Sequence, residues 1–159
     1  MNIYGIGQTA DGALWIGGVY GLWRFDGEGG GRSSESSGGG VWTQVTEPEE
    51  FTSSFINAVH ATPKGDLWVG TRNYGAFHYD REGRRSGEPS GAWAWMRYDV
   101  RDGLADNNVG SILQADDGSV WAATSRGVSR FDGRTWTTHA LPPDLRGGLR
   151  QSSDGALWL

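Results

Sequence analysis

One short motif recurs four times along the chain, and it limits the folds that are open to this sequence. Each copy is a turn ending in glycine, followed by one variable residue, an aliphatic residue and a tryptophan. The copies span residues 11–15, 64–68, 117–121 and 154–158, and their tryptophans lie 53, 53 and 37 residues apart. Such recurrence is typical of proteins built from equivalent supersecondary units that stack on one another.

Three further sequence elements recur in phase with this motif. A block that begins with glycine and reaches aspartate five residues later spans 21–26, 75–80 and 127–132, and a block that begins with tryptophan starts at 42, 95 and 136. An apolar segment precedes each turn, with aliphatic residues at Ile6, Val59, Ile112 and Leu149. The first two repeats are longer than the third by about 12 and 11 residues between the glycine-to-aspartate block and the tryptophan block. When this excess is subtracted, the tryptophan spacings of 53, 53 and 37 become repeat periods of 41, 42 and 37 residues. That range suits a four-stranded propeller blade.

The segment before each turn also carries a small residue at one fixed register: Gly5, Ala58, Ser111 and Gly148. Small side chains at one strand position indicate that neighbouring backbones approach closely there. In a propeller that crowding occurs at the hub, so we expect this segment to be the inner strand. The motif strand, the glycine-to-aspartate block and the tryptophan block follow as the second, third and outer strands.

Together these patterns predict an all-β fold with negligible helix. The expected fold is a β-propeller of four-stranded antiparallel blades, with about three and a half blades forming a partial or incomplete ring. The expected blades are residues 1–47, 48–100 and 101–141, followed by an incomplete blade at 142–159. We interpret the chain as the front part of a longer protein; the alternative is that two copies assemble a ring between them.

Two stretches account for the excess length of the first two repeats. Residues 28–40 and 81–91 are rich in glycine, serine and charged residues and lack apolar periodicity. They are predicted to be flexible insertions between a third and an outer strand.

Composition narrows the functional classes. A net charge of −5 argues against an electrostatic grip on nucleic acid. No apolar run is long enough to span a membrane, and no basic or hydrophobic leader follows Met1, so we expect no membrane segment and no signal peptide here. The three histidines fall at non-equivalent repeat positions, and no spacing resembles a metal site, so we expect neither metal nor cofactor.

One stretch carries a family resemblance. Residues 98–109 (YDVRDGLADNNV), continuing into Ile112, the turn at 117–118, and residues 120–121, 124, 127–128 and 131–132, resemble the two-component regulator propeller repeat. The strands LWIGG at 14–18 and LWVGT at 67–71 fit that repeat well, and VWAAT at 120–124 fits loosely. The resemblance implies propellers in the extracytoplasmic sensor region, periplasmic or secreted, of bacterial histidine kinases. Such propellers recognise saccharides or other ligands and transmit binding across a dimer, so the parent protein is expected to be dimeric.

The leading hypothesis for function is therefore a non-catalytic ligand-sensing propeller that recognises a glycan or another small ligand. A protein-interaction scaffold is the alternative, because propellers present broad surfaces. A lyase-type propeller enzyme is less favoured: streptogramin lyase is similar in repeat style, but its strand reads like Trp-Phe-Thr-Glu, whereas this chain has Trp-Ile-Gly-Gly and Trp-Val-Gly-Thr. No acid and base converge in the repeat alignment, so we expect no enzyme.

Residues that recur in every repeat are expected to be structural. These are the tryptophans Trp15, Trp68, Trp121 and Trp158, which we expect to pack between blades, and the turn glycines Gly12, Gly65, Gly118 and Gly155. The ligand candidates instead vary between repeats, on loops between second and third strands or just before an inner strand: Tyr20, Arg72, Asn73, Tyr74, Asn107, Asn108 and Arg126. Tyrosine can stack on a ligand, and arginine and asparagine can donate to hydroxyls or carboxylates. An ordinary solvated loop is the alternative for each.

Overall fold

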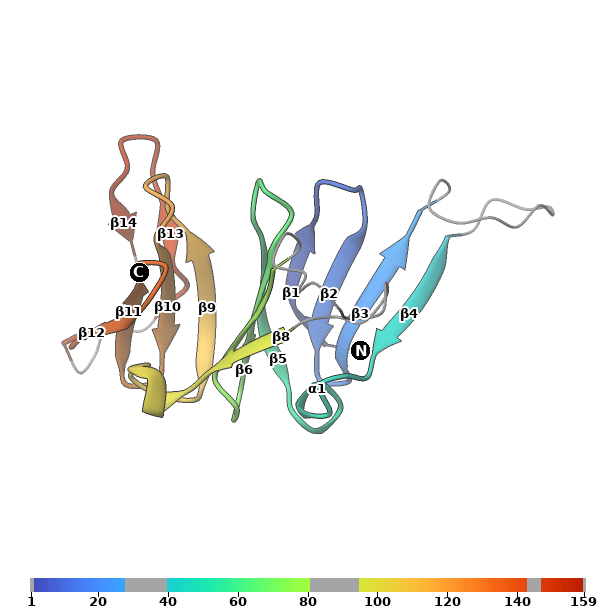
Figure 1. Ribbon diagram of the computed structural model, residues 1–159, viewed down its shortest axis with the longest axis horizontal. Coiled ribbons are helices and arrows are strands. Elements are labelled where there is room, and N and C mark those ends of the chain that lie inside the picture. Colours follow the sequence, from blue (N-terminus) through green and yellow to red (C-terminus); the bar gives the residue numbers. More distant parts are fainter. Residues whose placement is uncertain (1, 28–39, 81–94, 143–146, 159) are drawn as a thin grey trace.

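The regular structure of the chain is almost entirely β. The computed structural model describes residues 2–27, 40–80, 95–142 and 147–158, and Figure 1 shows their arrangement. The predicted insertions, 28–40 and 81–91, lie outside the described residues except for residue 40.

Three four-stranded antiparallel sheets and one two-stranded sheet make up the fold, each with its strands in chain order. The first sheet contains β1 (Ile3–Gln8), β2 (Leu14–Gly18), β3 (Gly21–Asp26) and β4 (Val41–Val45). The second contains β5 (Ile56–Ala61), β6 (Leu67–Thr71), β7 (Ala76–Tyr79) and β8 (Trp95–Tyr98). The third contains β9 (Val109–Gln114), β10 (Val120–Thr124), β11 (Gly127–Phe131) and β12 (Trp136–His139), and the last pairs β13 (Arg150–Gln151) with β14 (Leu157–Trp158).

Helix is limited to two short pieces in the described residues. The α-helix α1 covers Glu50–Ser53 and the 3-10 helix η1 covers Val100–Asp102. Each lies on the connection from an outer strand to the next inner strand. The predicted all-β class is confirmed.

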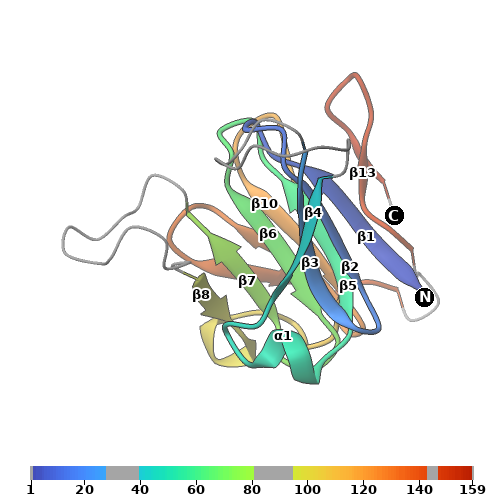
Figure 2. The ribbon, with the colours of Figure 1, turned by 90° about the vertical axis from the view of Figure 1, so that its right-hand side faces the viewer.

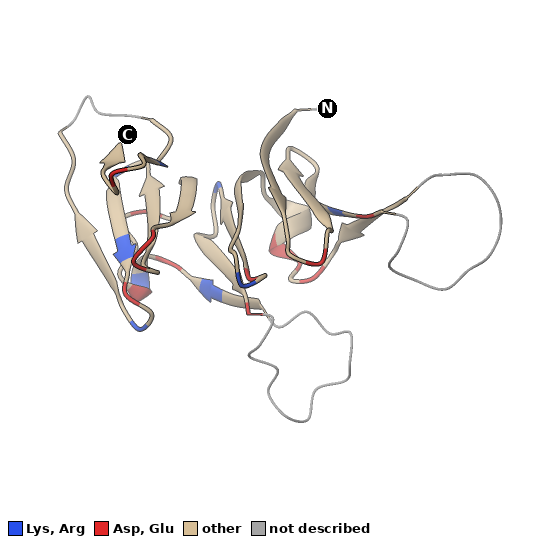
Figure 3. Ribbon diagram, turned by 90° about the horizontal axis from the view of Figure 1, so that it is seen from above, with Lys and Arg blue, Asp and Glu red and all other residues tan. Residues whose placement is uncertain are grey.

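The sheets stand side by side as an incomplete propeller. From right to left in Figure 1 the three four-stranded sheets follow one another in chain order, and β5 lies between β1 and β9. The predicted inner strands therefore line one side of the arc, and within the described residues the ring is not closed. Figure 3 shows acidic and basic residues interspersed over the sheets.

The inner strands approach so closely at one register that a side chain has no room there. A Cβ atom added to Gly5 would lie 2.6 Å from the backbone nitrogen of Val59. Real Cβ contacts are never that short, so glycine is required. The close approach predicted for the small-residue register is confirmed at Gly5. At the equivalent Gly148 the nearest atom is the Ser111 Oγ, 4.0 Å away.

Each of the first three repeat tryptophans packs between its own sheet and the next one along the chain, whereas Trp158 of the last described sheet is exposed. Trp15 belongs to an apolar cluster with Val59, Val69 and Phe77 of the second sheet. Trp68 belongs to the next cluster, which includes residues of the third sheet such as Ile112 and Phe131, and Trp121 packs against a third cluster that includes Leu149. The interfaces therefore all run in one direction, from the tryptophan face of one sheet to the opposite face of its successor.

The turns before the first and the last tryptophan strands are closed by the same arrangement of hydrogen bonds. The indole Nε1 of Trp15 donates to Thr9 Oγ1 at 3.1 Å, and Thr9 Oγ1 donates to Asp11 Oδ1 at 2.5 Å. Trp158 donates in the same way to the Ser152 Oγ, which donates to Asp154. All four turn glycines, Gly12, Gly65, Gly118 and Gly155, have a positive φ of 82–93°, a conformation that favours glycine.

In the third repeat the hydroxyl that accepts from the indole comes from a different position in the sequence. The position of Thr9 is taken by Ala115, and Trp121 Nε1 instead donates to Ser119 Oγ at 3.1 Å, with Ser119 Oγ donating to Asp117 Oδ1 at 2.5 Å. The geometry of the turn is thus preserved by a hydroxyl from the other side of the glycine.

A basic or imidazole side chain covers each of the first three repeat tryptophans. Arg24 lies 5.5 Å over the ring of Trp15, and Arg130 lies 5.8 Å over that of Trp121. The His78 ring stacks on Trp68 with centroids 4.2 Å apart. The covering group also pairs with an aspartate near the turn, as in the 3.1 Å contact of Arg130 with Asp117.

The close approach of Gly5 to Val59 yields a first prediction. Gly5→Ala should lower the free energy of unfolding by about 1–3 kcal/mol, because the added methyl group forces β1 and β5 apart. Urea unfolding followed by tryptophan fluorescence measures the change. Gly148→Ala is the matched control, since it holds the same repeat position with open space around it. Equal effects of the two substitutions would contradict the close-approach argument.

Candidate functional site

All seven sequence-predicted ligand residues lie on one face of the arc. This loop face, the lower edge in Figure 1, carries residues 19–20, 72–74 and 125–126 together with the connections 46–55 and 99–108. The opposite face, here the turn face, carries the glycine turns. The face assignment follows from the strand order, because alternate connections of an antiparallel sheet open on opposite edges.

The loop from β6 to β7 combines exposed polar side chains with an aromatic neighbour. Arg72 and Asn73 are exposed, and the Arg72 guanidinium lies 5.2 Å over the ring of Phe55. Tyr74 is half-buried, with its hydroxyl 3.5 Å from the Ser53 Oγ. This loop is therefore anchored on the connection that leads into β5, and its two polar tips project from a supported base.

Asn107 and Asn108 join neighbouring strands and sheets. The Asn107 carbonyl accepts from the Gly75 N–H at 2.9 Å, and its Oδ1 accepts from the Val100 N–H at 3.0 Å. Asn108 Oδ1 accepts from Asn57 Nδ2 at 3.2 Å. Both asparagines are partly buried, so much of their hydrogen-bonding capacity is used between the second and third sheets.

Tyr20 and Arg126 lie at the two sides of the loop face. Tyr20 is exposed, and its carbonyl accepts from Gln44 Nε2 at 3.1 Å. The exposed Arg126 pairs with Asp106, with Nε and Oδ2 3.1 Å apart. Tyr20 and the Arg72 loop belong to different sheets, and their convergence on one ligand stays a prediction.

A charged cluster missed by the sequence reasoning lies beside Tyr74. The buried Asp99 accepts from Arg101 Nη2 at 2.6 Å and lies 3.5 Å from Arg97 Nη2. Arg97 also pairs with Glu50 of α1 at 3.2 Å and lies 5.4 Å over the Tyr74 ring. The cluster fixes α1, β8 and η1 to one another beneath the candidate loop.

The carboxylate of Asp99 is held ionised by its donors. Hydrogen bonds from the Arg101 side chain, opposed by desolvation and aided by the Arg101 backbone N–H, lower the pKa of Asp99 from 3.8 to about 2. Asp99 also caps η1, and Asp102 Oδ2 accepts in return from the Asp99 N–H at 2.8 Å. This reciprocal pair is a capping box, and the Asp-x-x-Asp spacing is the sequence signal that could have revealed it.

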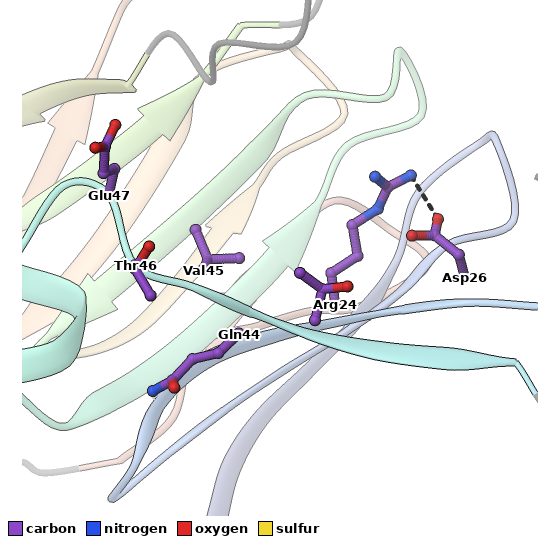
Figure 4. Close-up of a pocket in the computed structure, with 7 residues that line it drawn as sticks. Arg24, Asp26, Gln44, Val45, Thr46 and Glu47 are labelled. Carbon is purple, nitrogen blue, oxygen red and sulfur yellow. Dashed lines mark ion pairs between the residues drawn. The ribbon is translucent and has the colours of Figure 1, made fainter. Parts of the chain in front are cut away.

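A hollow of about 190 Å³ lies on the outer half of the first sheet and extends to the start of the connection 46–55. Figure 4 shows it, lined by Arg24, Asp26, Thr43, Gln44, Val45, Thr46 and Glu47. Arg24 Nη2 is 2.7 Å from Asp26 and 3.5 Å from Asp11. Its charge is therefore already balanced by two carboxylates, which weakens the hollow as an anion site.

Two partly buried histidines are engaged in structural contacts. His60 Nε2 accepts from the Gln114 N–H at 3.1 Å, which links β5 to β9, and burial lowers the pKa of His60. Burial also lowers the pKa of His78, although the neighbouring Asp66 opposes the shift. Over residues 2–27, 40–80, 95–142 and 147–158, no group of three or more His, Cys, Asp or Glu is placed to hold a metal ion. The same residues contain no helix with the length and apolarity needed to cross a membrane.

The Asp99 cluster yields a second prediction. Because the folded-state pKa of Asp99 is depressed, its stabilising effect is fully present above about pH 4 and is lost as the pH falls toward 2. Asp99→Asn should therefore lower the free energy of unfolding at pH 7 by about 1–2 kcal/mol and flatten its dependence between pH 4 and 2. Chemical unfolding at a series of pH values measures both.

Arg101→Gln serves as the control for this prediction. It keeps the cap but removes the side chain with the largest effect on the pKa of Asp99, so the acid loss of stability should be smaller than in the parent and should be complete at a higher pH. An Asp99→Asn variant with the acid profile of the parent would contradict the assignment.

Comparisons with known proteins bear on the repeats and on the fold. The model of the family "Two component regulator propeller" matches residues 50–73 and 103–126. Each matched segment runs from the connection before an inner strand, through the glycine turn and the tryptophan strand, into the next loop. No curated protein sequence matches the chain.

Solved structures share the fold over 98% of the chain. A protein described as the extracellular domain of the hybrid two component system BT3049 from B. thetaiotaomicron has a TM-score of 0.71 at 18% identity, with 20% of its length covered. Virginiamycin B lyase from Staphylococcus aureus has a TM-score of 0.62 at 15% identity, with 47% covered. The extracellular domain described for BT4673, also from B. thetaiotaomicron, has a TM-score of 0.53 at 17% identity, with 28% covered. This chain therefore spans between a fifth and about half of the proteins it is similar to, and at these identities the likeness establishes the fold alone.

Proposed function

We propose that this chain is a ligand-binding part of an extracytoplasmic sensor propeller. The proposal starts from the two segments that match the two component regulator propeller family, residues 50–73 and 103–126. The likeness to two domains described as extracellular parts of two component systems supports this proposal. The ligand is a saccharide or another small polar molecule, and the chain itself binds without catalysis.

The observation that carries the proposal is the loop from β6 to β7. Arg72 and Asn73 are exposed at its tip, within the matched repeat, and neither recurs at the same position in the other repeats. Side chains that vary on a fixed scaffold are where propellers can gain specificity without changing the fold. The guanidinium and amide groups can donate to sugar hydroxyls or carboxylates, and the partly exposed Tyr74 ring beside them offers a surface on which a sugar can stack.

A third prediction tests this loop. Arg72→Ala and Asn73→Ala should each weaken binding of a retained oligosaccharide at least about tenfold, because each removes donors from a site of few contacts. The probe is an array of neutral and acidic oligosaccharides, followed by calorimetry on any that bind.

Arg134→Ala is the matched control, since it removes an exposed arginine on the turn face. If it reduced affinity as much as Arg72→Ala, the effect would be one of net charge and the site assignment would fail. Absence of binding to every oligosaccharide would overturn the glycan class. Retention of a protein partner by the parent but not by the Arg72→Ala variant would support a protein-interaction scaffold instead.

The likeness to virginiamycin B lyase brings forward a second candidate, a lyase-type propeller enzyme. We place it second because His60 and His78 are held in contacts between strands and against Trp68. Incubation of the chain with virginiamycin B, followed by mass spectrometry, tests it. Conversion of the compound would replace the binding proposal with an enzymatic one.

A further inference from the structure

The loop from β6 to β7 belongs to the second sheet, which has a described sheet on either side. β5 contacts both β1 and β9, so the first and third sheets flank the sheet that carries this loop. Figure 2 looks along the stack of sheets, with the first sheet in front and α1 at the edge that forms the loop face. The contacts of this loop are therefore those of a sheet that has both of its neighbours.

The backbone of the loop is fixed at both ends. The Arg72 N–H donates to the Phe55 carbonyl at 3.0 Å. At the other end the Gly75 N–H donates to the Asn107 carbonyl at 2.9 Å. The buried Thr71 closes the loop from within, because its Oγ1 donates to the Gly75 carbonyl at 2.9 Å. A ligand that binds here meets a backbone that is already ordered, which lowers the entropic cost of binding.

The first of these contacts recurs in the other two four-stranded sheets, but with other side chains. The Val19 N–H donates to the Asn2 carbonyl at 3.3 Å. The Ser125 N–H donates to the Asn108 carbonyl at 3.1 Å. Of these three sheets only the second has an arginine and a phenylalanine at the two positions. Since the backbone contact forms without them, the fold does not require this pair of side chains.

The guanidinium of Arg72 keeps its hydrogen-bond donors available. It is exposed and lies 5.2 Å from the centroid of the Phe55 ring, over its face. A cation in this position is held by the electrostatic field of the ring, and the contact uses no N–H donor. Among the residues that the structure describes, none accepts a hydrogen bond from the Arg72 side chain. The ring thus orients the guanidinium, and its N–H donors remain for a ligand.

Three other arginines lie at or beside the loop face, and each already has a carboxylate partner. These ion pairs are Arg97 with Glu50 at 3.2 Å, Arg101 with Asp99 at 2.6 Å and Arg126 with Asp106 at 3.1 Å. Within the described part of the chain Arg72 has no such pair. A ligand carboxylate can therefore bind Arg72 without displacing an internal carboxylate, whereas at the other three arginines it has to compete with one.

We propose that Arg72 selects ligands that carry a carboxylate, so that the saccharide bound at this loop is one that contains a uronic acid. This inference rests on the function proposed above and narrows its ligand class. The planar guanidinium donates two parallel hydrogen bonds to a carboxylate, a geometry that a single hydroxyl does not match. Asn73 beside it donates to hydroxyls of the same ligand. Phe55 is a positioning residue that acts through Arg72.

Paired oligosaccharides test the ligand class. The probes are oligosaccharides of uronic acids, each compared with the neutral oligosaccharide that results when its carboxylates are reduced to alcohols. Sulfated oligosaccharides without carboxylates form a third set. In calorimetry on the whole chain, at least one uronic-acid member should bind about tenfold or more tightly than its reduced partner. Added salt should shrink that difference, because salt screens an exposed ionic contact.

Substitutions at Arg72 and Phe55 test the residue assignment. Arg72→Gln should bring the affinities for the two members of a pair to within about threefold of each other. Arg72→Lys should lose most of the preference, since an ammonium group lacks the planar fork. Phe55→Leu should reduce the preference while the affinity for the reduced member stays as in the parent. Arg134→Gln, which removes an exposed arginine on the turn face, is the matched control and should keep the preference. Circular dichroism checks that each variant folds like the parent.

The contrary results separate this inference from the function on which it rests. Equal affinity for the two members of every pair would overturn the carboxylate assignment and leave the proposed saccharide binding in place. Tighter binding of the sulfated set, or full retention of the preference by Arg72→Lys, would likewise overturn the assignment. Absence of binding to every oligosaccharide would overturn both this inference and the proposed function.

Discussion

The burial of one tryptophan per repeat against the following sheet is the interaction on which the rest of this structure depends. A four-stranded sheet of this size has two faces, and neither can be covered by the sheet itself. Trp15 and Trp68 pack against the facing side of the next sheet, where Val59 and Ile112 lie at the same register. In the first, third and fourth turns a hydroxyl and an aspartate hold the indole in place, so that the turn and the tryptophan are joined by one set of hydrogen bonds.

Much of this could be predicted from the sequence because the tryptophan motif repeats. Four in-phase copies of the motif specified the strand order, and the small residue at Gly5 correctly predicted the close approach to Val59. The sequence also placed the candidate ligand residues together on one face for the same reason, since alternation along the chain decides on which edge a loop opens. Whether Arg72, Asn73 and Tyr20 act on one ligand is not a property that the repeat can encode.

What the sequence could not reveal depends on contacts between residues that do not recur. The Asp99 cluster draws Glu50, Arg97 and Arg101 from three separate elements, and none of them has a counterpart in the other repeats. The Trp15 indole donates to Thr9, whereas the Trp121 indole donates to Ser119, which holds a different repeat position. The repeat alignment did not reveal this contact, because the hydroxyl has changed its position in the sequence. Trp158, which the repeat predicts to be buried, is exposed where its sheet has no described successor.

The pairing of the outer strands bears on how freely the loops at the turn face can change in length. Asp26 pairs directly with Val41, and Tyr79 with Trp95, so each outer hairpin is registered at the turn face whatever length of chain joins its ends. The entropy of closing such a loop rises only slowly with its length. Insertions can therefore accumulate or vanish at that edge during evolution without disturbing the stacked tryptophans.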